Sequence, residues 1–205
     1  MFPKYLQKLK RGPQVVLPKD AGLIIAYAGI GKESVVLDAG AGSGWLAVQI
    51  GRVAKKVVSY EKREDFASLS QENVKRNSLE NVQVKLRDVI GEGFDEKDAD
   101  VVILDFADSH LAIKNAIAAL NEKGIIVGYL PHAEQMNLFV QQLEANGFAD
   151  TYCIEGIVRE MLVRKAGVRP ANMGLMHTAY LVFAREGEKQ LDKRERKKQK
   201  RRERH

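Results

Sequence analysis

Three glycines and one acid downstream of them are the residues whose types and spacing most clearly predict chemistry. Gly40, Gly42 and Gly44 directly follow an apolar run that ends at Asp38. Glycines at such a junction let the backbone turn tightly and approach a ligand, and a helix that starts there presents free N–H groups. Glu61 lies 21 residues after Gly40, about the spacing at which an acid binds a ribose diol in nucleotide-binding α/β sheets. We therefore expect a cofactor that contains adenosine.

The spacing of the glycines also separates two classes of cofactor. A dinucleotide-binding loop reads G-x-G-x-x-G, whereas this chain has glycine at every second position from Gly40 to Gly44. Asp38, two residues before the first glycine, suits a cationic ligand with an amino-acid group better than it suits a pyrophosphate. The pattern therefore favours a cationic, amino-acid-bearing nucleoside over a dinucleotide.

Residues 36–44, VLDAGAGSG, resemble motif I of the class I S-adenosylmethionine-dependent methyltransferases. Glu61 matches the ribose-binding acid of these enzymes. Asp88 falls just after a third apolar run, where an Asp of the family meets the adenine amine. The resemblance implies that the cofactor is S-adenosylmethionine and that its binding residues include Asp38, Gly40, Gly42, Gly44, Glu61 and Asp88.

An acid at the end of a fourth apolar run predicts a substrate site beside the cofactor. Asp105 closes the run VVILD, and the next run closes with Tyr129, Leu130 and Pro131. Ligands of open α/β sheets bind outside the carboxyl ends of the strands, which places Asp105 beside the methyl donor. An Asp after a strand is also common as a turn residue or helix cap, and Asp108 fits that role.

Two further segments resemble the tRNA (adenine-N1)-methyltransferases that modify the T-loop. Residues 12–20, GPQVVLPKD, and residues 177–182, HTAYLV, look like signature segments of that family. Further residues fit that family in the same order along the chain, namely Tyr129-Leu130-Pro131, Gln135 and Arg159-Glu160. The resemblance covers about residues 11–186.

This second resemblance implies methylation of N1 of a tRNA adenine by a homo-oligomer, either a dimer or a tetramer. Asp105 would be the catalytic carboxylate and also border the donor, and Gln14 would hold the donor or the target pocket. The residues implied for the target base are Tyr129, Pro131, His177 and Thr178. Adenine N1 can attack the sulfonium methyl through its lone pair, and a carboxylate near the exocyclic amine stabilises the charge that develops. This reaction needs no metal, and we expect no metal site.

The chain departs from that family in three places. Leu17 stands where the family usually has Tyr, and residues 106–110, FADSH, replace a segment that contains Pro and Trp. Only about 35 residues precede the first expected strand. We therefore expect a short form without the separate N-terminal β domain of the family.

Two alternatives remain open from the sequence. Compact methyltransferases of corrin-ring biosynthesis have a similar core and size and also lack the β domain. A methyltransferase-like body could instead serve as a non-catalytic RNA-binding subunit. Such subunits often lose the donor site, whereas Gly40, Glu61 and Asp88 are all present here.

Short apolar runs rich in Val and Ile predict a doubly wound α/β fold. Runs without alternation are typical of parallel strands buried on both faces. We expect strands at residues 34–38, 56–60, 82–86, 101–105 and 125–130, and helices at residues 45–54, 64–77 and 133–146. A late strand at residues 178–184, after an irregular segment with Gly167, Pro170 and Gly174, is expected to be antiparallel. The expected architecture is a mostly parallel, seven-stranded, Rossmann-like methyltransferase sheet.

Charge is distributed unevenly and helps to define three segments. The net charge is +6, but residues 189–205 alone hold ten Lys and Arg against three Asp and Glu. We expect a helical lead-in at residues 1–30, a methyltransferase domain at residues 31–186, and a basic tail at residues 187–205 that is a solvated helix or disordered. Such a tail would attract the phosphate backbone of tRNA without reading its sequence.

Composition excludes several classes of protein. The 205 residues are 45% hydrophobic and 29% charged, as in a globular domain. Cys153 is the only cysteine, so an internal disulfide and a cysteine zinc site are both excluded. The longest apolar stretch is about ten residues, well short of the ~20 that a membrane-spanning helix needs. No apolar segment follows the N-terminal lysines as it would in a signal peptide, and we expect a soluble cytoplasmic protein without a membrane partner.

Overall fold

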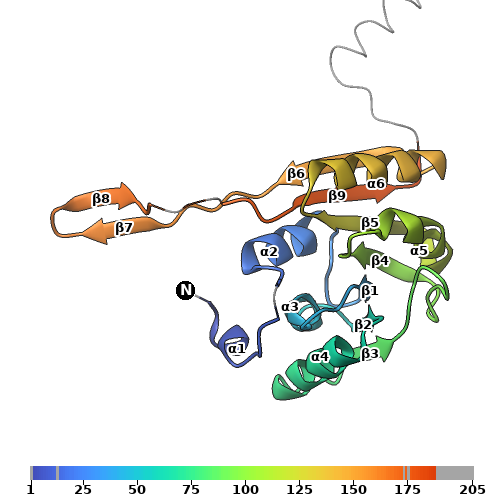
Figure 1. Ribbon diagram of the computed structural model, residues 1–205, viewed down its shortest axis with the longest axis horizontal. Coiled ribbons are helices and arrows are strands. Elements are labelled where there is room, and N and C mark those ends of the chain that lie inside the picture. Colours follow the sequence, from blue (N-terminus) through green and yellow to red (C-terminus); the bar gives the residue numbers. More distant parts are fainter. Residues whose placement is uncertain (1, 13, 173, 175, 188–205) are drawn as a thin grey trace, which may run out of the picture.

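A seven-stranded sheet organises the computed structural model of this chain (Figure 1). Residues 2–12, 14–172, 174 and 176–187 are described, so the expected basic tail lies outside the described residues apart from Gly187. The strand order is β3-β2-β1-β4-β5-β9-β6. The strands of this sheet are β1 (Val35–Ala39), β2 (Lys56–Glu61), β3 (Val82–Leu86), β4 (Ala99–Leu104), β5 (Leu120–Leu130), β6 (Asp150–Glu155) and β9 (Tyr180–Arg185).

The strands from β3 to β5 run parallel, as the apolar runs predict. β1 pairs with β2 on one side and with β4 on the other, and Asp38 of β1 is level with Ser59 and Ile103. The acids at the ends of these three strands therefore emerge at the same edge of the sheet. β9 runs antiparallel to both β5 and β6, which confirms the expected antiparallel late strand.

Helices cover both faces of the sheet and form two hydrophobic cores. Val36 belongs to the core that contains α1, α2 and α3, whereas Leu37 belongs to the core that contains α5 and α6. Alternate strand residues thus enter opposite cores, and the doubly wound α/β fold is confirmed. None of the helices in the described part of the chain is long and apolar enough to cross a membrane. The helices are α1 (Lys4–Gln7), α2 (Pro18–Tyr27), α3 (Trp45–Gly51), α4 (Glu64–Arg76), the 3-10 helix η1 (Ser109–Ala112), α5 (Ile113–Ala119) and α6 (Ala133–Ala145).

The prediction of an irregular segment before the last strand is wrong in part. Met161–Arg164 and Gly167–Pro170 form β7 and β8, an antiparallel hairpin separate from the main sheet. Gly167 has a φ of 140°, which a turn can use, and Pro170 ends an edge strand, a position that tolerates proline. β6 also has no counterpart among the expected strands, because none of its residues is buried.

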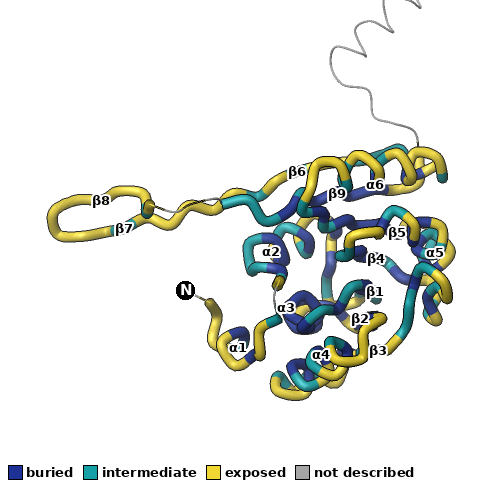
Figure 2. The backbone as a smooth tube through the Cα atoms, in the orientation of Figure 1, coloured by how far each residue is buried: buried dark blue, intermediate teal, exposed yellow. Residues whose placement is uncertain are grey.

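The β7–β8 hairpin projects from the body on an extended stalk (Figure 1). The chain leaves the sheet after β6, forms the hairpin and returns at β9. We call the described residues between β6 and β9 the arm. Figure 2 shows most of the hairpin exposed, and Val163 and Val168 are 76% and 62% exposed. The arm therefore presents apolar side chains to solvent.

A buried amide anchors the N-terminal lead-in beside the loop that follows β1. Asn73 of α4 accepts a hydrogen bond from the N–H of Lys10 (2.9 Å) and donates to the carbonyl oxygens of Lys10 and Ser43 (2.8 Å each). The indole of Trp45 donates to the same Lys10 carbonyl (3.2 Å). These bonds bring the segment that carries Gln14 to the edge of the sheet where β1 ends.

Candidate active site

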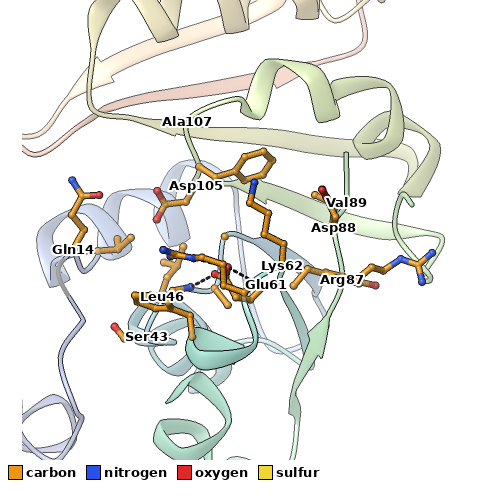
Figure 3. Close-up of a pocket in the computed structure, with 18 of the residues that line it drawn as sticks. Gln14, Ser43, Leu46, Glu61, Lys62, Arg87, Asp88, Val89, Asp105 and Ala107 are labelled. Atoms are coloured by element: carbon orange, nitrogen blue, oxygen red, sulfur yellow. Dashed lines mark hydrogen bonds and ion pairs between the residues drawn. The ribbon is translucent and has the colours of Figure 1, made fainter. Parts of the chain in front are cut away.

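A cavity of about 440 Å³ opens where β1, β2, β3 and β4 end. Figure 3 shows Gln14 on one side of it, Asp88 on the other, and Asp105 and Glu61 between them. Residues far apart in the sequence therefore meet in one cavity. The sequence-predicted residues that line it are Gln14, Gly40, Gly42, Glu61, Asp88 and Asp105.

The glycine loop after β1 shapes this cavity. Gly40, Gly42 and Gly44 have φ values of 91°, 52° and 75°, a left-handed backbone that favours glycine. A Cβ on Gly40 would lie 2.0 Å from the carbonyl oxygen of Asp105, so glycine is what lets these two segments come so close. Gly44 is not among the lining residues, and a Cβ there would lie 2.5 Å from the hydroxyl of Ser70 on α4. Two of the three glycines thus serve close packing as well as the turn.

Glu61, the last residue of β2, presents a carboxylate fixed from two sides. Its Oε2 accepts the N–H of Gly42 (2.9 Å), and its Oε1 accepts the backbone N–H (3.1 Å) and the Nε–H (3.4 Å) of Arg63. The residue is 5% exposed. A buried carboxylate held at the end of this strand suits the two hydroxyls of a ribose.

Asp38 lies in β1, just before the glycine loop, and does not line the cavity. It is 1% exposed; its Oδ2 accepts the hydroxyl of Ser59 (2.5 Å), and its Oδ1 has no hydrogen-bond partner among the described residues. The pKa of Asp38 is raised to about 6, mainly by burial. The hydrogen bond from Ser59 lowers this pKa and the charge of Glu61 raises it. Because a half-satisfied buried carboxylate is unfavourable, a cation bound nearby would stabilise its ionised form.

Asp105 follows β4 directly and faces the cavity. Its N–H donates to the carbonyl oxygen of Ala39 (2.8 Å), which fixes the segment after β4 to the end of β1. Burial raises the pKa of its carboxyl well above the usual value, and the charges of Asp38 and Glu61 raise it further. A carboxylate with increased proton affinity is a stronger hydrogen-bond acceptor and base.

The end of the cavity near β3 combines a fixed carboxylate with apolar side chains. Asp88 accepts the N–H of Ile90 through Oδ1 (3.0 Å). Val89 and Ile90 line this cavity together with Phe66, whose ring centroid lies 3.8 Å from the guanidinium carbon of Arg63. Apolar walls with a few placed polar groups are typical of small-molecule sites, and an acceptor beside such walls suits a purine amine.

Sequence reasoning missed several lining residues. Lys62 extends toward the segment that follows β4 (Figure 3), and Phe66 lies in the first turn of α4. Their only signal is position, since both come within five residues of Glu61. The position of Glu61 at the end of a strand marks the acid itself, but it does not indicate which neighbouring side chains face the cavity.

The residues predicted for the target base form a second cluster outside the cavity lining. His177 bonds Glu155 through Nδ1 (2.6 Å) and the carbonyl oxygen of Pro131 through Nε2 (2.9 Å). Both partners offer acceptor oxygens, which favours the form of the ring in which both nitrogens carry a proton. The bond to Glu155, followed by the bond to Pro131, accordingly raises the pKa of His177. His177 therefore ties the end of β5 to the end of β6.

Tyr129 is the second-to-last residue of β5 and does not line the cavity. Burial raises the pKa of its phenol, and the charges of Asp20 and Asp105 raise it further. The hydroxyl of Thr178 donates to Asp20 (2.8 Å). The four residues predicted for the target base thus lie around the end of β5, where His177 bonds to Pro131 and β9 begins beside Leu130, and the charge of Asp105 reaches Tyr129.

The arrangement can bind a cationic nucleoside and present a basic carboxylate beside it. Glu61 and Asp88 offer acceptors at two points of the cavity, while Asp105 also lines it and its charge reaches Tyr129. Across the described ranges, no group of three or more His, Cys, Asp or Glu side chains is placed to hold a metal ion.

A family model matches nearly the whole chain. The model is described as the tRNA methyltransferase complex GCD14 subunit, and it matches residues 4–205. The chain belongs to this family. The match begins in α1 and includes the lead-in, the glycine loop and the arm.

A curated relative supports the same assignment. It is the tRNA (adenine(57)-N(1)/adenine(58)-N(1))-methyltransferase TrmI from Methanocaldococcus jannaschii, which is 37% identical over 94% of this chain and 78% of its own length. The match therefore spans most of both proteins.

Two solved structures superpose closely on this family member. An S-adenosylmethionine-dependent O-methyltransferase from Thermotoga maritima gives a TM-score of 0.84 at 31% identity, covering 93% of this chain and 74% of that one. The tRNA (m1A58) methyltransferase TrmI from Aquifex aeolicus gives 0.82 at 28% identity, covering 88% and 73%. Corrin-ring enzymes among the similar structures are 14% to 17% identical, a level that shows the fold alone.

The raised pKa of Asp38 predicts how its removal changes stability with pH. The Asp38 carboxyl binds its proton more tightly in the folded than in the unfolded protein. The free energy of unfolding that this adds is fully present below about pH 4 and is lost as the pH rises through about 6. Asp38→Asn is therefore expected to stabilise the protein by about 2–3 kcal/mol more at pH 7.5 than at pH 4, relative to wild type. Urea unfolding at the two pH values measures this difference, and an equal effect at both would contradict it.

Proposed function

We propose that this chain is an S-adenosylmethionine-dependent methyltransferase that methylates N1 of an adenine in the T-loop of tRNA. The observation that carries the proposal is the Asp105 carboxyl, whose raised pKa and position beside a nucleoside-sized cavity suit it to an adenine amine. The tRNA substrate is supported by the family and by the TrmI relatives.

The cavity fits S-adenosylmethionine in charge and shape. Glu61 would bind the ribose hydroxyls, Asp88 would accept from the adenine amine, and Gln14 would close the opposite side. Asp38 Oδ1, which has no hydrogen-bond partner in the part of the chain that the structure describes, would supply negative charge to the positively charged end of the cofactor. When bound, the cofactor would supply a methyl group on a sulfonium sulfur, and the neutral thioether that remains after transfer is a good leaving group.

The proposed reaction needs only positioning and charge stabilisation from the protein. The lone pair of adenine N1 forms the new N–C bond while the C–S bond breaks, and the electrons of that bond remain on sulfur. Positive charge passes to the base and is shared with its exocyclic amine. Asp105 accepts a hydrogen bond from this amine and can take its proton. Alignment of the three reacting atoms contributes much of the remaining acceleration.

The target base would enter through the cluster at the end of β5. A T-loop adenine must first leave its stack to reach an enclosed site. Tyr129 and Pro131 would then border the base, and His177 would hold this wall in place through its bonds to Glu155 and Pro131.

The two alternatives have less support. The corrin-ring enzymes share the fold at an identity too low to carry their substrate to this chain. A non-catalytic RNA-binding subunit would not need a carboxyl with increased proton affinity beside the cavity, whereas Asp105 has one. Family membership supports the RNA substrate over a small molecule.

The arm supports a homo-oligomer, a dimer or a tetramer, in which it docks on a second copy. An isolated two-stranded hairpin is marginally stable in water, yet β7 and β8 are paired only with each other in the described sheet arrangement. Ile157 and Val158 of the arm are 58% and 60% exposed, so four apolar side chains of the arm, with Val163 and Val168, face solvent. Light scattering of the full chain is expected to give twice or four times the monomer mass, and a monomer would contradict this assembly.

The basic tail begins on the side of the sheet away from the cavity. β9 starts level with Leu130 at the end of β5 and runs back to Ala184, level with Ile126. Gly187 then donates its N–H to the carbonyl oxygen of Gly147 (3.0 Å) and accepts the N–H of Ala149 (3.1 Å). The tail itself lies outside the described residues. We propose that the tail attracts the phosphate backbone of tRNA at a distance from the reacting base. We also propose that the protein acts in the cytoplasm.

Asp105→Asn tests the catalytic assignment. Because Asn keeps the shape but cannot take a proton, we expect methylation of tRNA to fall at least about 100-fold while the affinity for S-adenosylmethionine stays within about threefold. Asp65→Asn, an exposed substitution on α4, is the control and should leave both unchanged. Loss of cofactor binding in parallel with methylation would contradict a catalytic role.

Deleting residues 188–205 tests the tail. Fewer phosphate contacts release fewer counterions, so tRNA should bind more weakly and the dependence of log Kd on log salt concentration should become shallower. Cofactor affinity is the control and should not change. Unchanged tRNA affinity at two salt concentrations would overturn this role.

A further inference from the structure

A second hollow, of about 460 Å³, opens between α1, the end of α3 and the end of α4. It shares no lining residue with the candidate active site. Of the seven described residues that line it, four are Lys or Arg and none is Asp or Glu. We call it the basic hollow, and its four cationic residues are Lys4, Lys8, Arg52 and Arg76.

Most of the positive charge in the basic hollow has no acid beside it. Arg76 is the exception, because its Nη2 bonds Glu72 Oε1 (2.7 Å). The same Glu72 also pairs with a lysine outside the hollow (2.9 Å). In the part of the chain that the structure describes, Lys4, Lys8 and Arg52 form no ion pair, and all three are exposed. These three cations are therefore available to an anion from solution.

The guanidinium of Arg52 is held against an aromatic ring. Its central carbon lies 4.5 Å from the ring centroid of Tyr5, which also lines the hollow. Such stacking fixes the plane of a guanidinium and leaves its N–H edge available to a ligand. That edge can donate two parallel hydrogen bonds to a phosphate. Arg52 is therefore arranged as a phosphate-binding side chain is.

Helix dipoles explain only part of this cluster. Arg52 caps the C-terminus of α3 and Arg76 ends α4, where positive charge is favourable. Lys4 and Lys8 lie four positions apart along the four-residue α1 and its C-cap, so they are neighbours on one face and repel each other. Leu6, between them, is 1% exposed and anchors α1 in the core. The fold alone gives no reason for the two lysines, whereas a bound anion would remove their repulsion.

The lead-in runs from the basic hollow to the catalytic cavity and carries further positive charge. Lys10 and Arg11 follow α1 and are both exposed, and Gln14 lines the cavity. Trp45, which also lines the cavity, and Arg52 stand seven positions apart at the two ends of α3. At 1.5 Å per residue this is about 10 Å along the helix axis. A polynucleotide with one base in the cavity can therefore reach the basic hollow.

We propose that the basic hollow binds a backbone phosphate of the tRNA substrate through Lys4, Lys8 and Arg52. This inference rests on the proposed function, which supplies the RNA. A phosphodiester carries one negative charge and offers only acceptors, so it is complementary to three side chains that only donate. Contacts of this kind set the position of a nucleic acid and carry no sequence information. The hollow therefore orients the tRNA, while the cavity selects the base.

Binding of an unmodified tRNA transcript to the full chain, followed by fluorescence anisotropy without any methyl transfer, tests the proposal. For Lys4→Gln combined with Lys8→Gln, we expect Kd to rise at least about threefold near 0.1 M salt. The slope of log Kd against log salt concentration should become shallower by about 1 to 2, because fewer counterions are released. Arg52→Lys keeps the charge but loses the paired N–H donors, and it should also weaken binding.

Lys97→Gln combined with Lys123→Gln is the matched control. It removes the same charge from two exposed lysines elsewhere on the chain, and it should leave both Kd and the slope unchanged. An equal loss in this control would show that general charge, rather than the hollow, attracts the RNA, and it would overturn the proposal. Unchanged binding in the Lys4 and Lys8 variant would overturn it as well. If that variant fails to fold, Lys8→Gln alone and Arg52→Lys undergo the same comparison.

Steady-state kinetics adds a second readout. Because the hollow is remote from the reacting atoms, the Lys4 and Lys8 variant should raise KM for tRNA and leave kcat and the affinity for S-adenosylmethionine unchanged. A fall in kcat at unchanged tRNA affinity would contradict a role in binding.

The binding measurement separates this inference from the proposed function. If the wild-type chain methylates no tRNA but the hollow variant alone loses tRNA affinity, the proposed function fails and the phosphate site stands. If the wild-type chain methylates tRNA and the hollow variant binds it normally, only the phosphate site fails. Inorganic pyrophosphate serves as a probe for a free anion. Saturable pyrophosphate binding that the variant loses and that tRNA does not displace would assign the hollow to a free anion and overturn the proposal.

Discussion

Negative charge concentrated at one edge of a parallel sheet is the constraint on which the rest of this structure depends. The strand order places β2, β1 and β4 side by side, so Glu61, Asp38 and Asp105 fall within electrostatic reach of one another. Burial raises the pKa of Asp38 and Asp105, and the three acids together favour a cationic ligand. Gly40 makes the crowding possible, since any side chain there would collide with the backbone of Asp105.

The strand-end acids could be predicted because their position follows from the topology. A run of apolar residues marks a strand buried on both faces, and parallel strands share the edge at which their last residues emerge. That reasoning found Glu61, Asp88 and Asp105, which all line the cavity. It could not tell that Asp38 stays outside the cavity lining, because one residue of register decides whether a side chain faces a ligand or the core.

Other features were beyond sequence reasoning because they depend on contacts between distant residues. Lys19 meets Thr178 and Gly156 only after the sheet has formed. The β7–β8 hairpin has no buried face in the described chain, so it lacks the apolar pattern by which strands are recognised, and its glycine and proline suggest a loop. The Lys19 hydrogen bonds join Gly156, where the arm begins, to α2 and to Thr178, two residues before the start of β9.

The most direct test of the central claim is methyl transfer from S-adenosylmethionine to unmodified tRNA transcripts, followed by nucleoside mass spectrometry of the digested RNA. We expect 1-methyladenosine from the wild-type chain and its loss with Asp105→Ala. Methylation of another base or of another atom of adenine would contradict the proposed chemistry. Cofactor binding without any methylated nucleoside, tested on the full chain in its assembled state, would contradict the RNA substrate.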